Sequence, residues 1–227
     1  MDLTPQHIWA SMGVPAKMVV FTLLIMLFWS VYVAIERTLL FMKARRQSRD
    51  LAEAIGKPLG QGNLEGALKV AKDEAYKASY LATVLRAGLA ELAARPDRHG
   101  VDAVKRVLDR VSTQENAALR KGLNVLATTG STAPFVGLVG TIMGIINAFT
   151  MMSKEGGGDL TAISGGIAEA LVTTAVGIAV AIVAIWVYNY FNAVLDDISK
   201  DVETSTKELI DWSEKEILRR AEQQAAK

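Results

Sequence analysis

The chain has 227 residues, and its 25 lysines and arginines are balanced by 24 acidic residues, which leaves a formal net charge of +1. The basic residues alternate with acidic ones and lack interleaved aromatics, so nucleic acid is a poor candidate partner. The absence of cysteine excludes disulfides and thiolate chemistry, and with only two histidines no zinc site of the usual spacing can be assembled.

The hydrophobic fraction of 51% is above the usual globular share, and the excess lies in three charge-free blocks, 18–35, 122–153 and 170–195. Each block reaches the length of roughly 18 residues that signals a membrane-spanning helix. The first block is too long for the apolar core of a signal peptide and lacks a small-residue cleavage site, so we expect a retained anchor. The sequence therefore predicts an all-α membrane protein with three transmembrane helices, assigned to 18–42, 122–153 and 161–195.

The distribution of basic residues predicts the orientation. Sixteen of the 25 lysines and arginines lie between Lys43 and Lys121, whereas the turn between the second and third spans carries only Lys154. Basic residues close to span ends mark the cytoplasmic side. The prediction places the N-terminal segment 1–17 and the turn 154–160 outside, and the helical domain 43–121 and the C-terminal helix 196–227 in the cytoplasm.

The cytoplasmic part has helical periodicity. Apolar residues between 79 and 94 recur at steps of three and four, and this pattern stops before Pro96. A second pattern begins after Gly100 and meets no strong breaker before the second span, so we expect that helix to continue into the membrane. The third span is likewise expected to continue into the tail, and 57–63 is expected to be a turn.

The second span contains small residues at four-residue steps, Gly140 with Gly144 and Gly137 with Thr141. This spacing allows a neighbouring helix to approach closely, and for the glycines we favour simple helix packing. Pro134 is expected to bend the helix, which neighbouring helices or hydroxyls can accommodate. Thr141 has a different role only if it faces a cavity.

Glu169 is the most informative polar residue of the spans. If the third span starts near Leu160, a rise of about 1.5 Å per residue places the carboxyl roughly 13 Å in. A charge there costs about 2.5 to 3.5 kcal/mol, so the side chain should face protein or water and serve a purpose, such as proton transfer driven by the membrane potential. The alternative is a structural carboxylate satisfied by a neighbouring hydroxyl.

Two threonines follow Glu169. Helical spacing places Thr173 on the same face, one turn on, whereas Thr174 is rotated by about 140°. Either hydroxyl could line water, or could simply bond back to the preceding turn.

Enzymatic sites are not supported. There is no P-loop motif, and serines such as Ser131 and Ser164 have no histidine partner for a hydrolase triad. We expect no enzymatic activity, no cofactor and no metal.

The stretches GSTAPFVGLVGTIMGIINAF (130–149) and GGIAEALVTTAVGIAVAI (165–182) resemble the MotA/TolQ/ExbB proton-channel family, closest to its TolQ and ExbB branches. The order of parts is also similar: one span, a large cytoplasmic insertion, two further spans and a helical tail. The chain departs from the family at Ser164, where relatives often have a proline before the glycine pair.

The resemblance implies a pentamer in a bacterial inner membrane, whose second and third spans line a pore around a dimeric, single-span ExbD-like or TolR-like partner. It assigns the proton pathway to Thr141, Glu169 and Thr174, and Thr173 stays as the alternative from helical spacing. It implies that the proton-motive force energises outer-membrane transport, Tol-type envelope maintenance or gliding-type motility, with a TonB-like, TolA-like or motility protein as a further partner. A sodium-driven variant and a structural scaffold without ion flow remain alternatives.

Overall fold

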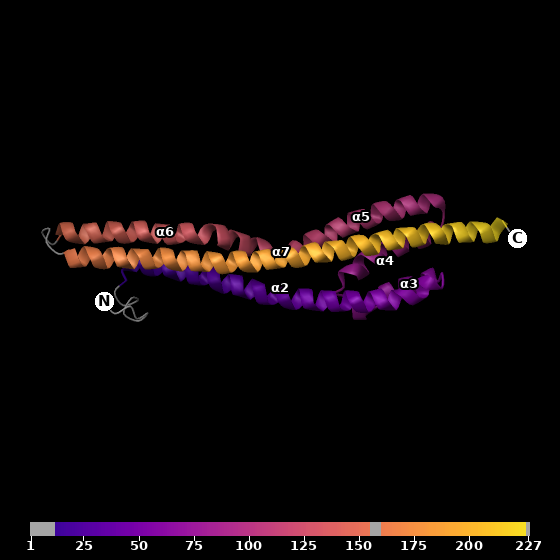
Figure 1. Cartoon of the computed structure of the whole chain (residues 1–227), viewed down its shortest axis with the longest axis horizontal. Coiled ribbons are helices and arrows are strands. Elements are labelled where there is room, and N and C mark those ends of the chain that lie inside the picture. Colours follow the sequence, from indigo (N-terminus) through magenta and orange to yellow (C-terminus); the bar gives the residue numbers. More distant parts are fainter. Residues whose placement is uncertain (1–11, 155–159, 226–227) are drawn as a thin grey trace. The chain divides into compact units, whose positions relative to one another are not determined.

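The computed structural model describes residues 12–154 and 160–225, and within them every regular element is helical (Figure 1). In chain order these are α2 Val14–Gly60, α3 Leu64–Ala71, the short 3-10 helix η1 Glu74–Tyr76, α4 Tyr80–Ala94, α5 Arg98–Arg120, α6 Leu123–Lys154 and α7 Leu160–Ala225. The prediction of an all-α chain is confirmed for these residues. Residues 1–11 of the predicted N-terminal segment and 155–159 of the predicted turn lie outside them.

Three helices, α2, α6 and α7, are long and apolar enough to cross a membrane. Most residues in the most apolar stretch of each helix are not buried by the rest of the chain. The buried share is 22% in α2, 22% in α6 and 33% in α7. Large side chains such as Phe28, Phe135 and Trp186 stay exposed. A continuous apolar surface of this kind requires lipid or another protein subunit as its neighbour.

Two of these helices extend well beyond the predicted spans. α7 continues to Ala225, as the pattern after the third span predicted. α2 continues to Gly60, so the segment that starts at Lys57 forms its last turn, and the chain turns only at Gln61 and Gly62. Gly62 has φ +69°, a conformation that glycine adopts readily at a helix end. The bounds of the spans themselves remain predictions.

The expectation of one continuous helix from the cytoplasm into the second span is wrong. α5 ends at Arg120, α6 begins at Leu123, and Gly122 between them has φ +89°. Side chains with a Cβ are strained at this φ and glycine is not, so Gly122 breaks the helix.

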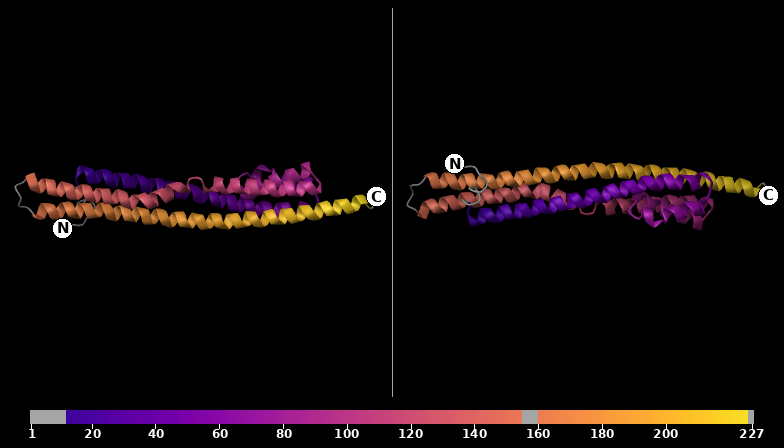
Figure 2. Two further views of the ribbon diagram at one scale, coloured as in Figure 1. Left: turned by 90° about the horizontal axis from the view of Figure 1, so that it is seen from above. Right: turned by 90° about the horizontal axis from the view of Figure 1, so that it is seen from below.

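The chain divides into two compact units, one formed by 1–35 with 122–191 and the other by 36–121 with 192–227. The first unit contains the first part of α2, the whole of α6 and the first part of α7. In both views of Figure 2, α6 runs beside this part of α7. The three helices share one core, in which Leu23 of α2 packs with Ala133 of α6 and Val180 of α7.

In the second unit, side chains cap the starts of three helices. Asn63, Ser79 and Asp97 accept hydrogen bonds from the backbone N–H groups three residues further on, at 2.8, 3.1 and 2.7 Å. These caps fix the starts of α3, α4 and α5. The predicted helix at 79–94 is confirmed, since α4 spans Tyr80–Ala94.

The core of the second unit joins α4, α5 and α7. A Cβ added at Gly88 of α4 would lie 2.7 Å from Leu108 Cδ2 of α5 and 2.9 Å from Leu209 Cδ2 of α7. Trp212 of α7 donates its indole N–H at 2.8 Å to the carbonyl of Leu59 near the end of α2, which also accepts the backbone N–H of Gly62 at 3.0 Å. The glycine and the tryptophan thus set how closely α7 approaches its neighbours within this unit.

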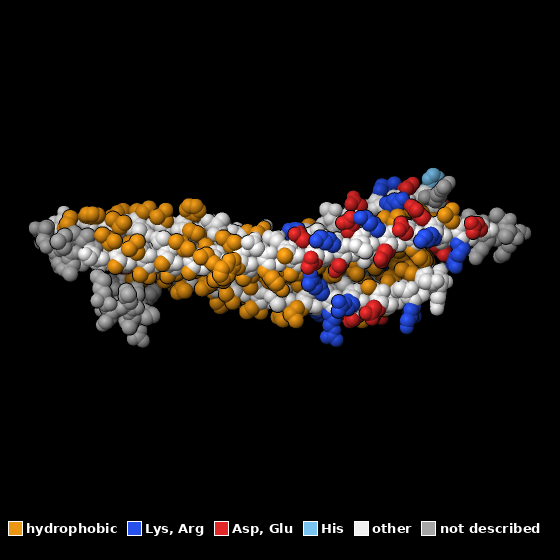
Figure 3. All heavy atoms as spheres, viewed as in Figure 1, with side chains coloured by type: hydrophobic (Ala, Val, Ile, Leu, Met, Phe, Trp, Pro, Cys, Tyr) orange, Lys and Arg blue, Asp and Glu red, His pale blue; other side chains and the backbone are white. Residues whose placement is uncertain are grey.

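Charged side chains gather over the second unit in Figure 3, while hydrophobic ones cover the first. Exposed ion pairs join α7 to α2 and α5 within the second unit; they are Arg45–Asp197, Lys105–Glu214 and Arg120–Asp196. Pairs at this exposure contribute at most about 1 kcal/mol each, so the unit is stabilised mainly by its apolar core.

Tyr80 of α4 provides a test of how α4 packs on α7 within the second unit. Its ring is buried and its hydroxyl donates to Asp201 Oδ2 at 2.9 Å; burial, followed by this hydrogen bond, raises the pKa of Tyr80 to about 12. Because the folded state holds the phenolic proton more tightly than the unfolded state, the associated stability is complete below pH 10 and is lost as pH rises towards 12. We expect about 2 to 3 kcal/mol of destabilisation over that range, and in Tyr80→Phe this contribution disappears.

The measurement is the tyrosinate absorbance of the full chain in detergent, titrated between pH 9 and 12.5 and compared with that of Tyr80→Phe. The difference between the two titrations should have its midpoint near pH 12. A midpoint near 10 would show that Tyr80 is accessible and that α4 does not pack on α7 at this residue.

Candidate functional site

The residues singled out in the sequence lie on α6 and α7 of the first unit. Thr141 is on α6, and Glu169, Thr173 and Thr174 are on α7. The site is therefore built between two antiparallel helices that the chain connects directly.

The two helices approach each other closely at glycines. A Cβ added at Gly137 of α6 would lie 2.9 Å from Thr173 O and 3.0 Å from Thr174 Cα, and one added at Gly177 of α7 would lie 2.7 Å from Ala133 O. Real Cβ atoms do not approach backbone atoms at such distances. Any side chain at these positions would force the helices apart, as expected for contacts between small residues in membranes.

The other glycines predicted for packing lie on the same contact. A Cβ at Gly140 would lie 2.6 Å from Thr173 Oγ1, and one at Gly144 would lie 2.8 Å from Ala170 Cβ. α6 runs through Pro134 without interruption. The structure thus places Gly137, Gly140 and Gly144 along one line facing α7.

Three threonine hydroxyls converge on one carbonyl of this contact. Thr141, Thr173 and Thr174 each have Oγ1 within 3.2–3.3 Å of Gly137 O. The hydroxyls of Thr141 and Thr174 also contact each other, and those of Thr141 and Thr173 lie 3.1 and 2.7 Å from Ala170 O. A hydroxyl has one proton to donate, so these groups share two carbonyls in alternative arrangements. We call these three residues the threonine cluster.

The two threonines of α7 in the cluster differ in their exposure. Thr173 is fully buried under Gly140, whereas Thr174 is partly exposed and contacts Thr141, which is also partly exposed. Thr173 is thus an interior contact between the helices. Thr141 and Thr174 form the part of the cluster that a solvent or partner group can reach.

Glu169 makes a contact that the sequence did not indicate. Its Oε1 accepts a hydrogen bond of 2.7 Å from the backbone N–H of Gly13, directly before α2. The carboxyl is part-buried. In the structural alternative to proton transfer, a neighbouring hydroxyl was the expected partner of this carboxyl; its partner in the structure is the backbone N–H of the residue directly before α2. Pro15 was a readable signal that a helix starts close to Gly13, but the sequence does not show which side chain would accept the N–H of Gly13.

The arrangement favours hydrogen-bond exchange over covalent chemistry. Threonine hydroxyls both donate and accept, and a carboxyl group can also hold a proton. Within the described ranges, no group of three or more histidine and carboxylate side chains is placed to hold a metal ion. The groups of the site can thus exchange hydrogen bonds and hold a proton.

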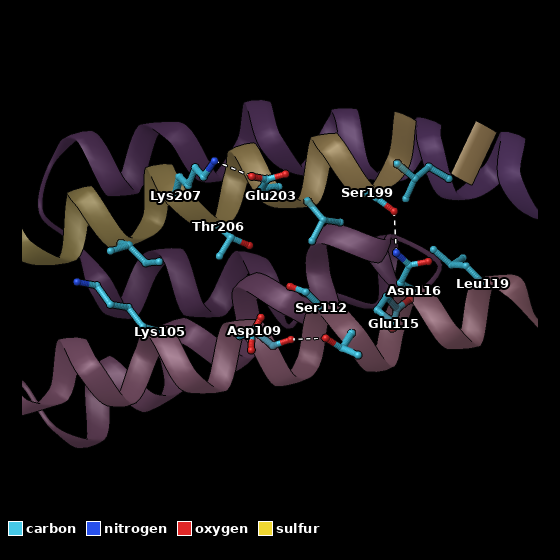
Figure 4. A pocket seen from close by; sticks show the side chains of 14 residues that line it. Lys105, Asp109, Ser112, Glu115, Asn116, Leu119, Ser199, Glu203, Thr206 and Lys207 are labelled. Atoms are coloured by element: carbon cyan, nitrogen blue, oxygen red, sulfur yellow. Dashed lines mark hydrogen bonds and ion pairs between the residues drawn. The ribbon is translucent and has the colours of Figure 1, made fainter. Parts of the chain in front are cut away.

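A second polar feature lies in the second unit, where a pocket of about 380 Å³ separates α5 from α7 (Figure 4). Ser112 Oγ and Thr206 Oγ1, both lining residues, are buried with no hydrogen-bond partner in the part of the chain that the structure describes. Burial raises the pKa of Glu115 in the same lining. Such hydroxyls require water or a polar group. No residue singled out in the sequence lines this pocket.

Comparison with known proteins identifies the region that contains the site. The family model described as the MotA/TolQ/ExbB proton channel family matches residues 77–204, more than half of the chain and a range that includes Thr141, Glu169 and Thr174.

Individual relatives agree with this match. The biopolymer transport protein ExbB of Pseudomonas putida is 33% identical over 197 residues, covering 84% of this chain and 57% of that protein. ExbB of Xanthomonas campestris pv. campestris is 38% identical over 109 residues, with coverages of 48% and 43%. The Tol-Pal system protein TolQ of Pseudomonas aeruginosa is 39% identical over 116 residues, with coverages of 48% and 50%. The chain spans about half the length of the curated relatives it matches.

The close approach of α6 and α7 can be tested by adding a single methyl group. Gly137→Ala places a Cβ against backbone atoms of α7, which cannot rotate away, so we expect a loss of about 1 to 3 kcal/mol. The thermal unfolding temperature of the full chain in detergent should fall. Gly165→Ala on α7 is the matched control, because nothing lies within 4 Å of its added Cβ. If both variants unfold at the wild-type temperature, the helices are not in contact at Gly137.

Proposed function

The chain belongs to the MotA/TolQ/ExbB proton channel family, and on this basis we propose that it is the proton-conducting subunit of an inner-membrane motor. In this proposal the proton-motive force drives a process of the cell envelope. Relatives are named for biopolymer transport and for the Tol-Pal system. The candidate processes are therefore outer-membrane transport and Tol-type envelope maintenance, with gliding-type motility as a third.

The observation that carries the proposal is the threonine cluster between two apolar helices, with Glu169 one turn before Thr173. Polar groups in such segments are unfavourable unless they serve a pathway or pair with each other. Thr141 and Thr174 remain partly exposed while the residues around them are apolar. This exposure supports the proposal that both residues line a wet path along α6 and α7.

No aspartate lies in the predicted spans of this chain. Glu169 and the hydroxyls would supply a wettable lining, and the principal proton acceptor would be an aspartate of an ExbD-like or TolR-like partner. Proton passage would then turn or shift the channel ring relative to that partner. A TonB-like, TolA-like or motility protein would receive the work.

The proposed assembly is a homopentamer around a dimer of the single-span partner. The large exposed apolar surface of α2, α6 and α7 supports it, because lipid and neighbouring subunits are what such a surface requires. The proposed topology has the N-terminus in the periplasm and the large helical domain and tail in the cytoplasm. The concentration of basic residues between Lys43 and Lys121 supports this orientation.

The second candidate function is a structural scaffold without ion flow. It is favoured by the fact that each threonine of the cluster reaches a backbone carbonyl, and that Glu169 reaches a backbone N–H. In that case these residues would only hold the three helices together.

The two candidates differ in the effect of substitution on proton flux. With the partner co-reconstituted in liposomes, we expect Glu169→Ala and Thr174→Val each to lower the flux about tenfold or more, equivalent to roughly 1.4 kcal/mol on the barrier. Thr150→Val is the control for loss of a hydroxyl, because Thr150 is exposed on α6 and, within the described part of the chain, its hydroxyl bonds back to Ile146 O. It should change the flux by less than twofold.

Unchanged flux in Glu169→Ala, with the assembly intact by native mass spectrometry, would exclude the pathway and favour the scaffold. The same mass measurement tests the pentamer and two bound copies of the partner. Replacing sodium by choline in the flux assay separates the proton-driven from the sodium-driven variant, since only the latter would stop.

A further inference from the structure

The start of α2 is set back along α6 and α7 from the end at which the chain connects these two helices (Figure 2). Gly13 precedes α2 and donates its N–H to Glu169, which is nine residues into α7. α6 and α7 therefore extend beyond the start of α2, and Glu169 lies level with that start.

The contact suits both partners electrostatically. The first turn of α2 contains no acidic residue, so the partial positive charge at this helix start has no counterpart within that turn. The carboxyl of Glu169 provides one from α7. A hydrogen bond of 2.7 Å has the length of one strengthened by a charged acceptor.

Apolar packing fixes the same end of α2. Met12, Ala16 and Val20 are buried in one cluster that includes Val172 of α7. Met12 is 5% exposed, so the residue directly before Gly13 is covered when the contact is closed. The hydrogen bond and the cluster thus anchor the start of α2 on α7 together.

We propose that the backbone N–H of Gly13 is the positioning group for Glu169, and that the Gly13–Glu169 hydrogen bond couples the start of α2 to the proton pathway. The inference rests on the proposed function for its link to proton flux. The coupling of the two positions can be measured without that function.

Two substitutions at Gly13 separate the effect of losing the backbone N–H from the effect of adding a side chain. Gly13→Pro removes the donor, whereas Gly13→Ala retains it. The φ of Gly13 is not positive, and an added Cβ would lie 3.5 Å from Asn147 Nδ2 and 3.7 Å from Glu169 Oε1. Both are ordinary contact distances, so alanine fits at this position.

The absence of cysteine in the chain allows a single reporter, Met12→Cys, whose alkylation rate by a maleimide measures opening of the start of α2. In the full chain in detergent, with stability checked by thermal unfolding, we expect Gly13→Pro and Glu169→Ala each to raise the rate about tenfold, and Gly13→Ala to leave it within twofold. The double variant Gly13→Pro with Glu169→Ala should react no faster than either single variant, because both remove the same bond.

Multiplicative effects in the double variant would overturn the proposal, since they would show that the two positions act independently. So would equal rates in all variants. A general weakening of the fold by Gly13→Pro would not reproduce the pattern, because it would add to the effect of Glu169→Ala.

Proton flux provides the second readout in the assembled complex. Gly13→Pro should lower it as Glu169→Ala does, and Gly13→Ala should preserve it. If the wild type shows no flux while the alkylation rates follow the expected pattern, the proposed function fails and the coupling stands. If flux depends on Glu169 but is unchanged in Gly13→Pro, the positioning role fails and the proposed function stands.

Discussion

The close approach of α6 to α7 is the constraint on which the rest of the first unit depends. At Gly137 and Gly177 the two backbones are so near that no Cβ fits between them. In a membrane, apolar side chains gain little by leaving lipid, so packing of this kind has to supply the specificity of helix association. The line of small residues on α6 sets the register of α7, and the register decides which polar groups meet.

The same approach makes a backbone carbonyl available to side chains of the other helix. Gly137 O has a second lone pair after its bond within α6, and threonines from both helices reach it. In an apolar environment a hydroxyl without a partner would be unfavourable, so the cluster is satisfied where it stands. Because three hydroxyls share two carbonyls, the bonds can rearrange without leaving any group unpaired.

The periodicity and the apolar blocks were sufficient to predict an all-helical chain with three candidate spans, since both depend on local sequence. The break at Gly122 was missed because a glycine next to an apolar block looks like part of it, and its φ is not visible in the sequence. Spacing along one helix grouped Thr173 with Glu169. It could not show that Thr174 meets Thr141, or that Gly13 meets Glu169, because both contacts depend on register between helices.

The two polar parts of the site differ in how readily they change. The hydroxyls of the threonine cluster have alternative partners within the cluster, so they can exchange donors and acceptors without a further group. Glu169 Oε1 is held by the N–H of Gly13, so turning this oxygen towards a new partner breaks that hydrogen bond and leaves the N–H without this acceptor. In the proposed channel the carboxyl, held by the residue before α2, is therefore the group whose release can control proton passage, and the hydroxyls form the lining beyond it.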